Sequence, residues 1–219
     1  MGKRGPKPKG KVKIKWSSNF AYAIGLITTD GCLYNDGRHI SFTSKDLVLA
    51  ELFKICLSLT VKIGKKASSS KLEKKYYHVQ FGDVIFYHFL LSIGLMPAKS
   101  KIMAEMCVPD KYFFDFIRGC FDGDGHFYSY WDLRWKSSYM FYTVFSSASK
   151  NHINWLQSQL FLKLGIHGHI TKNSKKPVYN LKYAKKESIV LLPKIYYSKH
   201  VCCLDRKRDK IKMATVLKI

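Results

Sequence analysis

The chain has 219 residues, of which 47% are hydrophobic, so it can form one large domain or two small ones around a real core. Its 38 lysine and arginine residues outnumber 15 acidic ones and leave a net charge of +23, which favours a polyanionic partner because neutralised phosphates release counterions. The sequence has no apolar stretch of membrane-spanning length and no hydrophobic signal core, which predicts a soluble, intracellular protein in the cytoplasm or an organelle matrix of its host.

Aromatic residues make up 15% of the chain and are interleaved with the basic ones, a mixture that suits nucleic acid better than a bland basic surface. The six cysteines form no Cys-x-x-Cys pair and no zinc-like spacing with histidine, so we interpret them as reduced residues. Nucleic acid is therefore the favoured partner.

Residues 1–15 form a basic N-terminal arm with seven lysines and arginines, two prolines and no acidic residue. A segment of this composition cannot form a core. We expect either a solvated tail or a segment that settles along phosphates or in a minor groove.

After the arm, the chain repeats one pattern twice. The segment NFAYAIGLITTDGCLY (19–34) aligns with FFDFIRGCFDGDGHFY (113–128), which places Asp30 and Asp124 at equivalent positions. The duplication predicts a pseudo-two-fold α+β molecule. The expected boundaries of the two repeats are residues 16–109 and 110–219.

The elements within each repeat follow from hydrophobic periodicity and turn residues. Each repeat opens with a helix, continues with two strands and a second helix, then has two more strands and an apolar closing helix. In the first repeat the expected segments are 19–29, 38–59, 76–83 and 84–95, and in the second they are 113–123, 139–165, 178–187 and 188–197.

The strands alternate apolar and polar residues, so one face of each sheet is predicted to cover the core and the other to face outwards. Outward polar rows carry donors and acceptors that can read base edges in a DNA major groove, although an ordinary solvated sheet face has the same pattern. The inward residues are Ile40, Phe42, Val79, Phe81, Leu181 and Tyr183, and the outward ones are His39, Ser41, Thr43, His78, Gln80, Asn180 and Lys182.

The opening helices contain Gly25 and Gly119 at matching positions, although a glycine inside a helix costs about 1 kcal/mol. Close packing of the two helices would explain both glycines and would bring Asp30 and Asp124 together at the C-terminal helix ends. Because such ends carry partial negative charge, two carboxylates there need a cation, and hard oxygen ligands favour Mg²⁺. An Asp-Gly turn is the simpler explanation for either motif alone, but its repetition in register favours a metal site.

The motifs AIGLITTDG (23–31) and IRGCFDGDG (117–125) resemble the two signatures of the single-chain LAGLIDADG homing endonucleases, and the order of elements matches over residues 17–212. The resemblance implies duplicated αββαββα units with two four-stranded antiparallel, saddle-shaped sheets, helices packed on one face and a central two-helix interface. It also implies a monomer, active in intron homing, that hydrolyses both strands of double-stranded DNA across the minor groove.

By the same resemblance, Asp30 and Asp124 are the catalytic, metal-binding acids. Roughly two or three divalent cations per complex, Mg²⁺ by expectation, would clamp the attacking and leaving oxygens. The backbone carbonyls of Thr29 and Gly123 are possible secondary ligands.

The family also tends to carry a basic residue in each half that helps at the scissile phosphate. The segments GLMPAKSKIM (94–103) and CLDRKRDKI (203–211) resemble those that supply it. The residues that we nominate are Lys99 and Lys207, with Lys101 and Arg206 as close rivals.

The first motif departs from the family pattern at two positions. Thr28 stands where an acid is usual, and Thr29 stands where a small residue is usual. The β-branched Thr29 would face Gly123 in the tight helix seam, which puts equal cleavage of the two strands in question.

Each saddle should span roughly 10 bp, so the pair would cover about 20 bp of asymmetric sequence. The two halves differ in their outward residues, as an asymmetric target requires. The residues expected to contact DNA are Tyr34, Arg38, His39, Ser41, Thr43, Lys65, Lys66, Lys75, His78, Gln80, Tyr128, Tyr130, Arg134, Lys136, Tyr142, His167, His169, Lys172, Asn180 and Lys182.

Two other functions stay open. The same scaffold without cleavage would be a DNA or RNA binder, either a transcription regulator or a splicing maturase with intron RNA as its partner. Thr28 and Thr29 fit this alternative weakly, whereas the two retained aspartates argue against it. In the other alternative, an unrelated basic RNA-binding protein uses its Asp-Gly pairs as turns.

Overall fold

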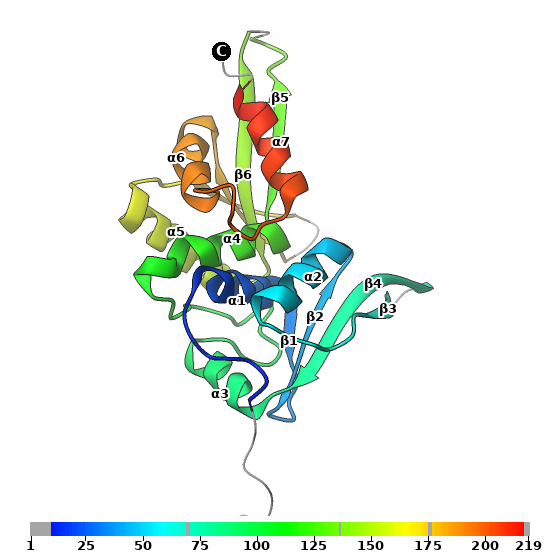
Figure 1. Ribbon diagram of the computed structural model, residues 1–219. Helices are drawn as coiled ribbons and strands as arrows, with labels where there is room; N and C mark the ends of the chain where they lie inside the picture. Colours follow the sequence, from blue (N-terminus) through cyan, green and yellow to red (C-terminus); the bar gives the residue numbers. More distant parts are fainter. Residues whose placement is uncertain (1–9, 69–70, 136, 175–176, 217–219) are drawn as a thin grey trace, which may run out of the picture.

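A computed structural model describes residues 10–68, 71–135, 137–174 and 177–216 of the chain. Both repeats have the predicted order of elements (Figure 1). The first contains α1 (Ser18–Asp30), β1 (Gly31–Leu33), β2 (His39–Ser44), α2 (Leu47–Cys56), β3 (Gly64–Ser68), β4 (Lys71–Gly82) and α3 (Val84–Ser92). The second contains a 3₁₀ turn (Asp110–Tyr112), α4 (Phe113–Gly123), β5 (His126–Trp131), β6 (Tyr139–Ser147), α5 (Lys150–Leu164), β7 (His169–Lys172), β8 (Tyr179–Tyr183), α6 (Lys185–Ile195) and a further helix, α7 (Asp205–Val216).

The helices α2 and α5 begin at side-chain caps in equivalent positions of the two repeats. Asp46 Oδ1 accepts a hydrogen bond from the backbone N–H of Val48 at 3.1 Å, and Ser149 Oγ accepts one from His152 at 3.4 Å. Each cap satisfies a backbone donor that the first helical turn leaves unpaired. None of the helices within the described residues is long and apolar enough to cross a membrane.

Each repeat contributes one four-stranded antiparallel sheet. The strand order is β1-β2-β4-β3 in the first sheet and β5-β6-β8-β7 in the second. The helix α2 packs on the first sheet, α5 and α6 pack on the second, and α7 lies along β5. Figure 1 shows α1 and α4 side by side between the two sheets. The predicted fold class is therefore confirmed.

The strand register confirms the predicted alternation of faces. Ile40 pairs with Phe81 and both are buried, whereas the neighbouring Gln80 is exposed. In the second sheet, Leu181 is buried and Lys182, the next residue, has the outward register. The inward faces of both sheets and the helices α1 and α4 belong to one hydrophobic core.

The helices α1 and α4 meet with their backbones in contact at Gly25 and Gly119. A Cβ atom on Gly25 would lie 2.8 Å from Cα of Gly119, and one on Gly119 would lie 2.9 Å from Cα of Gly25. Real Cβ atoms do not approach other atoms so closely, so no side chain fits at either position. The expected close approach of the two helices therefore explains both glycines.

The described part of the N-terminal arm packs against the first repeat. The backbone N–H groups of Lys11 and Val12 donate to Asp83 Oδ2 at 2.5 and 2.9 Å, and the side chain of Val12 is buried. Residues 1–9 of the arm lie outside the described residues. The boundaries proposed for the arm and for the two repeats stay predictions, because one core runs through both halves.

We expect Gly119→Ala to lower the free energy of unfolding by about 1–3 kcal/mol, because the added methyl group would overlap the backbone of α1. Gly64→Ala is the matched control, since a Cβ atom there would lie 3.6 Å from its nearest neighbour, the carbonyl oxygen of His78. Urea-induced unfolding of both variants measures the difference. An equal loss in the two variants would contradict the tight seam.

Candidate active site at the ends of the central helices

The two candidate acids stand at the C-terminal ends of the paired helices. Asp30 is the last residue of α1, and Asp124 is the C-cap of α4. The seam continues to these ends, since a Cβ atom on Gly123 would lie 3.2 Å from Oδ2 of Asp30. One acid from each repeat therefore converges at the same place.

The surroundings of the two acids disfavour their charged forms. Burial raises the pKa of Asp30 to about 7, and the negative charge of Asp124 adds to the rise, whereas Lys99 and Lys207 oppose it. Desolvation raises the pKa of Asp124 as well, against the same two lysines, although this residue opens to solvent at the mouth of the site. Two carboxylates held in this way gain from a shared cation.

Lys99 reaches the end of α1 from the loop that follows α3. Its Nζ donates to the carbonyl oxygen of Gly31 at 2.6 Å and to that of Thr29 at 3.3 Å. The lysine is 5% exposed, and burial lowers its pKa. A positive charge in this position offsets the partial negative charge of the helix end.

Lys207 holds the equivalent position at the end of α4. Burial lowers its pKa to about 8, against the raising effect of Asp122. Lys101, the alternative to Lys99 in the loop after α3, is exposed. The Nζ of Lys207 donates to three carbonyl oxygens, those of Phe121, Asp122 and Gly125, at 2.7, 2.8 and 2.6 Å.

The donor set at the helix ends suits a hard divalent cation. Asp30 and Asp124 offer carboxylate oxygens, the ligands that Mg²⁺ prefers. Within the described ranges, no three His, Cys, Asp or Glu side chains gather to hold a metal ion. The remaining ligands would be backbone carbonyls, water or phosphate oxygens. Of the two carbonyls that we nominated, that of Thr29 accepts the bond from Lys99.

Asp122, the other acid of the second motif, ties the end of α4 to its neighbours. Its buried carboxylate accepts hydrogen bonds from the hydroxyl groups of Tyr22 and Tyr196, at 2.9 and 2.7 Å, and from the backbone N–H of Leu204 at 2.7 Å. The equivalent residue of the first repeat, Thr28, instead donates to a carbonyl one turn earlier in α1 at 2.8 Å. The two motifs therefore anchor their helices differently.

Thr29 fits into the seam because Gly123 faces it. A Cβ atom on Gly123 would lie 2.9 Å from Cβ of Thr29. The threonine hydroxyl donates to the carbonyl oxygen of Leu26 at 3.0 Å, within its own helix. The β-branched residue is accommodated by the missing side chain opposite.

A groove flanks each acid. The Asp30 groove, about 300 Å³ in volume, combines Asp30 and the end of β2 at Thr43 and Ser44 with the second motif at Asp122 and Gly123. The Asp124 groove, about 290 Å³ in volume, combines the equivalent residues, Asp124, Ser146, Ser147, Thr28 and Thr29. The grooves are therefore related by the pseudo-two-fold axis, and each draws residues from both repeats.

Polar side chains are linked across the outward faces of the sheets beside these grooves. Thr43 Oγ1 lies 2.8 Å from His78 Nδ1, and His78 Nε2 lies 3.1 Å from Gln80 Oε1. In the second sheet, Ser146 Oγ donates to Asn180 Oδ1 at 2.7 Å. These contacts fix polar groups on the outward faces of both sheets.

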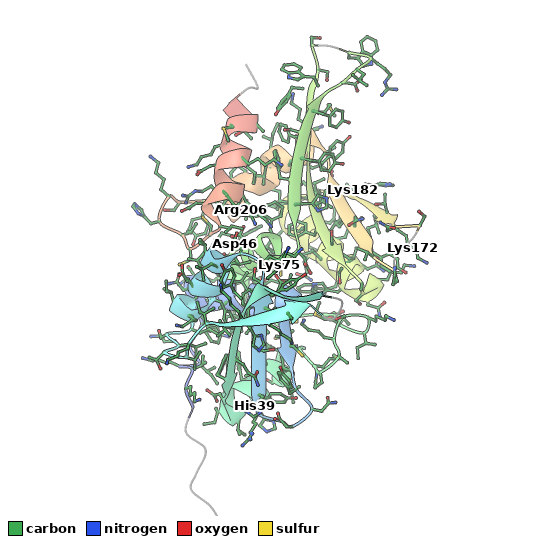
Figure 2. The ribbon with its side chains drawn as sticks, turned by 90° about the vertical axis from the view of Figure 1, so that its right-hand side faces the viewer. His39, Asp46, Lys75, Lys172, Lys182 and Arg206 are labelled. Atoms are coloured by element: carbon green, nitrogen blue, oxygen red, sulfur yellow. The ribbon has the colours of Figure 1, made fainter. Side chains whose placement is uncertain are left out.

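Most of the other nominated DNA contacts also have the outward register or lie in the loops at the sheet ends. Figure 2 labels His39 on the first sheet and Lys182 on the second. The residues in this group are Tyr34, Arg38, His39, Lys66, Tyr128, Tyr130, Arg134, Tyr142, His169 and Lys182.

Three nominated lysines have the opposite register. Lys65 pairs with Tyr77, and Lys172 pairs with Tyr179, whose side chains pack against the core. Lys75 is two residues before Tyr77 in β4 and so shares its face. A shift of one position along a strand reverses the face, which is why these lysines belong to the helix side of the sheets.

Three further nominations are covered, lie on the helix side, or lie outside the described residues. Ser41 has the outward register but is only 3% exposed, because the flanking strands cover the central strand β2. The ring of His167 lies 4.5 Å from that of Phe161 on α5, on the helix side of the sheet. Lys136 lies outside the described residues.

The sequence analysis did not predict one ion pair that joins the two repeats. Arg206 Nε lies 2.8 Å from Asp46 Oδ2 at the Asp30 groove (Figure 2). Asp46 also caps α2. Its partner is 160 residues away, so no local pattern signals the contact.

The comparisons with known proteins agree with this geometry. Residues 113–195 match the model of the LAGLIDADG-like domain. The match lies within the second repeat and includes the second motif. No curated protein matches the sequence. The resemblance noted in the sequence is thus confirmed, and α4, with the second motif, lies within the matched residues.

Solved structures extend the match to the whole fold. The meganuclease I-SmaMI bound to uncleavable DNA is similar over 92% of each chain, with a TM-score of 0.61 and 14% identity. A single-residue variant of the homing endonuclease I-DmoI, in complex with its target DNA and manganese, covers 84% of this chain and 96% of its own, with a TM-score of 0.55 and 18% identity. Full-length DUF199/WhiA from Thermatoga maritima covers 94% of this chain and 63% of its own, with a TM-score of 0.58 and 15% identity.

The raised pKa of Asp30 predicts how the stability of this LAGLIDADG fold depends on pH. Because the folded-state pKa of about 7 lies above the value of 3.8 for a free aspartate, stability is fully present below pH 4 and is lost as pH rises towards 7. We therefore expect Asp30→Asn to stabilise the fold by more than about 1 kcal/mol at pH 8 and by much less at pH 4.5. Urea-induced unfolding at the two pH values, without divalent ions, measures this difference. A gain that does not depend on pH would contradict the raised pKa.

Proposed function

We propose that this protein is a site-specific DNA endonuclease. It binds a long, asymmetric double-stranded target of about 20 bp as a monomer and hydrolyses both strands across the minor groove with divalent metal ions. The observation that carries the proposal is the convergence of Asp30 and Asp124, one from each repeat, at the ends of the paired helices.

The charge and the similar structures support DNA as the substrate. A net charge of +23 favours a polyanion, and the outward faces of both sheets carry linked polar groups. The similar structures of I-SmaMI and I-DmoI contain DNA, and they were determined with calcium ions and with manganese, respectively. Divalent ions fit the oxygen donors at the helix ends, and Mg²⁺ is the ion that we propose.

The proposed chemistry assigns a separate task to each group of residues. Divalent ions at this site would polarise the attacking water and neutralise charge on the phosphate and the leaving oxygen. Asp30 and Asp124 would hold the ions, each beside the groove that receives one strand. Lys99 and Lys207 fix the helix ends through the carbonyl oxygens of Gly31 and Gly125, and they keep positive charge near the place where negative charge develops.

A second candidate is a DNA or RNA binder that does not cleave. The match to DUF199/WhiA, which carries no nuclease name, and the threonines at positions 28 and 29 favour this candidate. An intron RNA partner, intron homing and an intracellular location stay predictions.

Cleavage of a plasmid library in Mg²⁺ tests the proposal. We expect staggered double-strand breaks at one class of site, and we expect Asp30→Asn and Asp124→Asn each to reduce cleavage by roughly 100-fold or more, because each variant removes a metal ligand. Sequencing of the cut ends identifies the site.

Two controls separate the candidates. Asp209→Asn removes an exposed acid on α7, and its cleavage should equal that of the unaltered protein. Asp124→Asn should still bind the target when Ca²⁺ replaces Mg²⁺. Tight, specific binding by the unaltered protein without any cleavage would favour the non-cleaving binder.

A further inference from the structure

The two grooves beside the acids are equivalent in position but differ in the charged residues that line them. The Asp124 groove contains Lys99, whose Nζ already donates to the carbonyl oxygens of Gly31 and Thr29. At the start of α2, the first repeat carries Lys45 and Asp46 at the Asp30 groove. The equivalent residues of the second repeat are Ala148 and Ser149. Ser149 is fully buried and its hydroxyl donates to the carbonyl oxygen of Met103, so it offers no charge to the Asp124 groove.

Arg206 adds to this difference. It stands at the start of α7 and reaches the Asp30 groove from the other repeat (Figure 2). Its neighbour Lys207 caps α4 as Lys99 caps α1, so the residue equivalent to Arg206 is Ala98. A guanidinium group therefore lines one groove, and the residue at the equivalent position of the other half carries no charge.

Asp46 is a fixed anchor for this guanidinium group. One of its carboxylate oxygens caps α2 through Val48 at 3.1 Å, and its own backbone N–H donates to Ser44 Oγ at 3.1 Å. The second carboxylate oxygen binds Arg206 Nε at 2.8 Å. The aspartate side chain is 21% exposed and that of the arginine 66%, so a rigid acid holds an accessible base.

The geometry of the pair leaves Arg206 able to bind an anion. The contact with Asp46 uses Nε, and among the described residues no hydrogen bond engages the terminal Nη1 and Nη2 atoms. Such exposed ion pairs contribute little to stability, so the contact orients the side chain more than it stabilises the fold. A guanidinium group presents its terminal N–H groups as a planar fork that matches phosphate oxygens.

We propose that Arg206, held in place by Asp46, binds a backbone phosphate of the DNA strand in the Asp30 groove and makes the two strand-cleavage sites unequal. The inference rests on the proposed function. The strand in the Asp30 groove gains a contact that the other strand lacks, so it is cut first and a nicked intermediate accumulates. Arg206 is a positioning residue, because it holds the strand and does not touch the reacting atoms.

Strand-resolved cleavage of a target duplex labelled on both strands tests this asymmetry. We expect the unaltered protein to cut one strand faster. Arg206→Ala should slow that strand about fivefold or more and leave the other within about twofold, so that the two rates approach each other. Arg206→Lys should restore part of the difference. Asp46→Asn keeps a good helix cap and should shift the ratio in the same direction by less.

Phosphate-ethylation interference on the complex in Ca²⁺ gives a second readout that does not depend on cleavage. Arg206→Ala should abolish interference at a phosphate on one strand only. Lys212→Ala, an exposed lysine on the same helix, should change neither measurement. Equal rates in the unaltered protein, or equal slowing of both strands by Arg206→Ala, would overturn the inference. Strand-specific interference without any cleavage would sustain the Arg206 contact and reject the endonuclease.

Discussion

The backbone contact between α1 and α4 determines the rest of the molecule. With Gly25 and Gly119 facing each other, the two helices approach so closely that their last residues share one small volume. That approach brings Asp30 and Asp124 together and places the two sheets on either side of the seam. The site needs both repeats, because either repeat alone supplies only one of the two acids.

The site also shows why such a seam needs support. Two carboxylates at negative helix ends repel each other. The fold places a lysine at each end to offset their charge, Lys99 buried and Lys207 half-buried. In the second repeat, Asp122 adds three hydrogen bonds that hold the end of α4 against α1 and the segment before α7. The two carboxylates, when charged, destabilise the fold. This is expected of a site that binds a cation.

Much of the fold and the two acids of the site could be predicted from the sequence, because the same motif occurs twice. Asp30 and Asp124 stand at equivalent positions of the two repeats. An Asp-Gly turn would explain either aspartate alone, but it does not explain why both repeats have one at the same position. The faces of some strand residues, such as Lys65, were harder to predict, because β3 is short and one position along a strand reverses the face. The contact of Asp46 with Arg206 left no trace in the sequence, since only the folded molecule brings the start of α2 to the start of α7.

We propose that one carboxylate from each repeat binds the same divalent cations over a bound duplex. Anomalous scattering from crystals of the DNA complex grown with Mn²⁺ tests it most directly. We expect manganese peaks at the end of the helix seam, with both Asp30 and Asp124 in direct coordination and a DNA phosphate as a further ligand. Peaks that touch only one of these acids, or that lie away from the seam while DNA is bound, would contradict it.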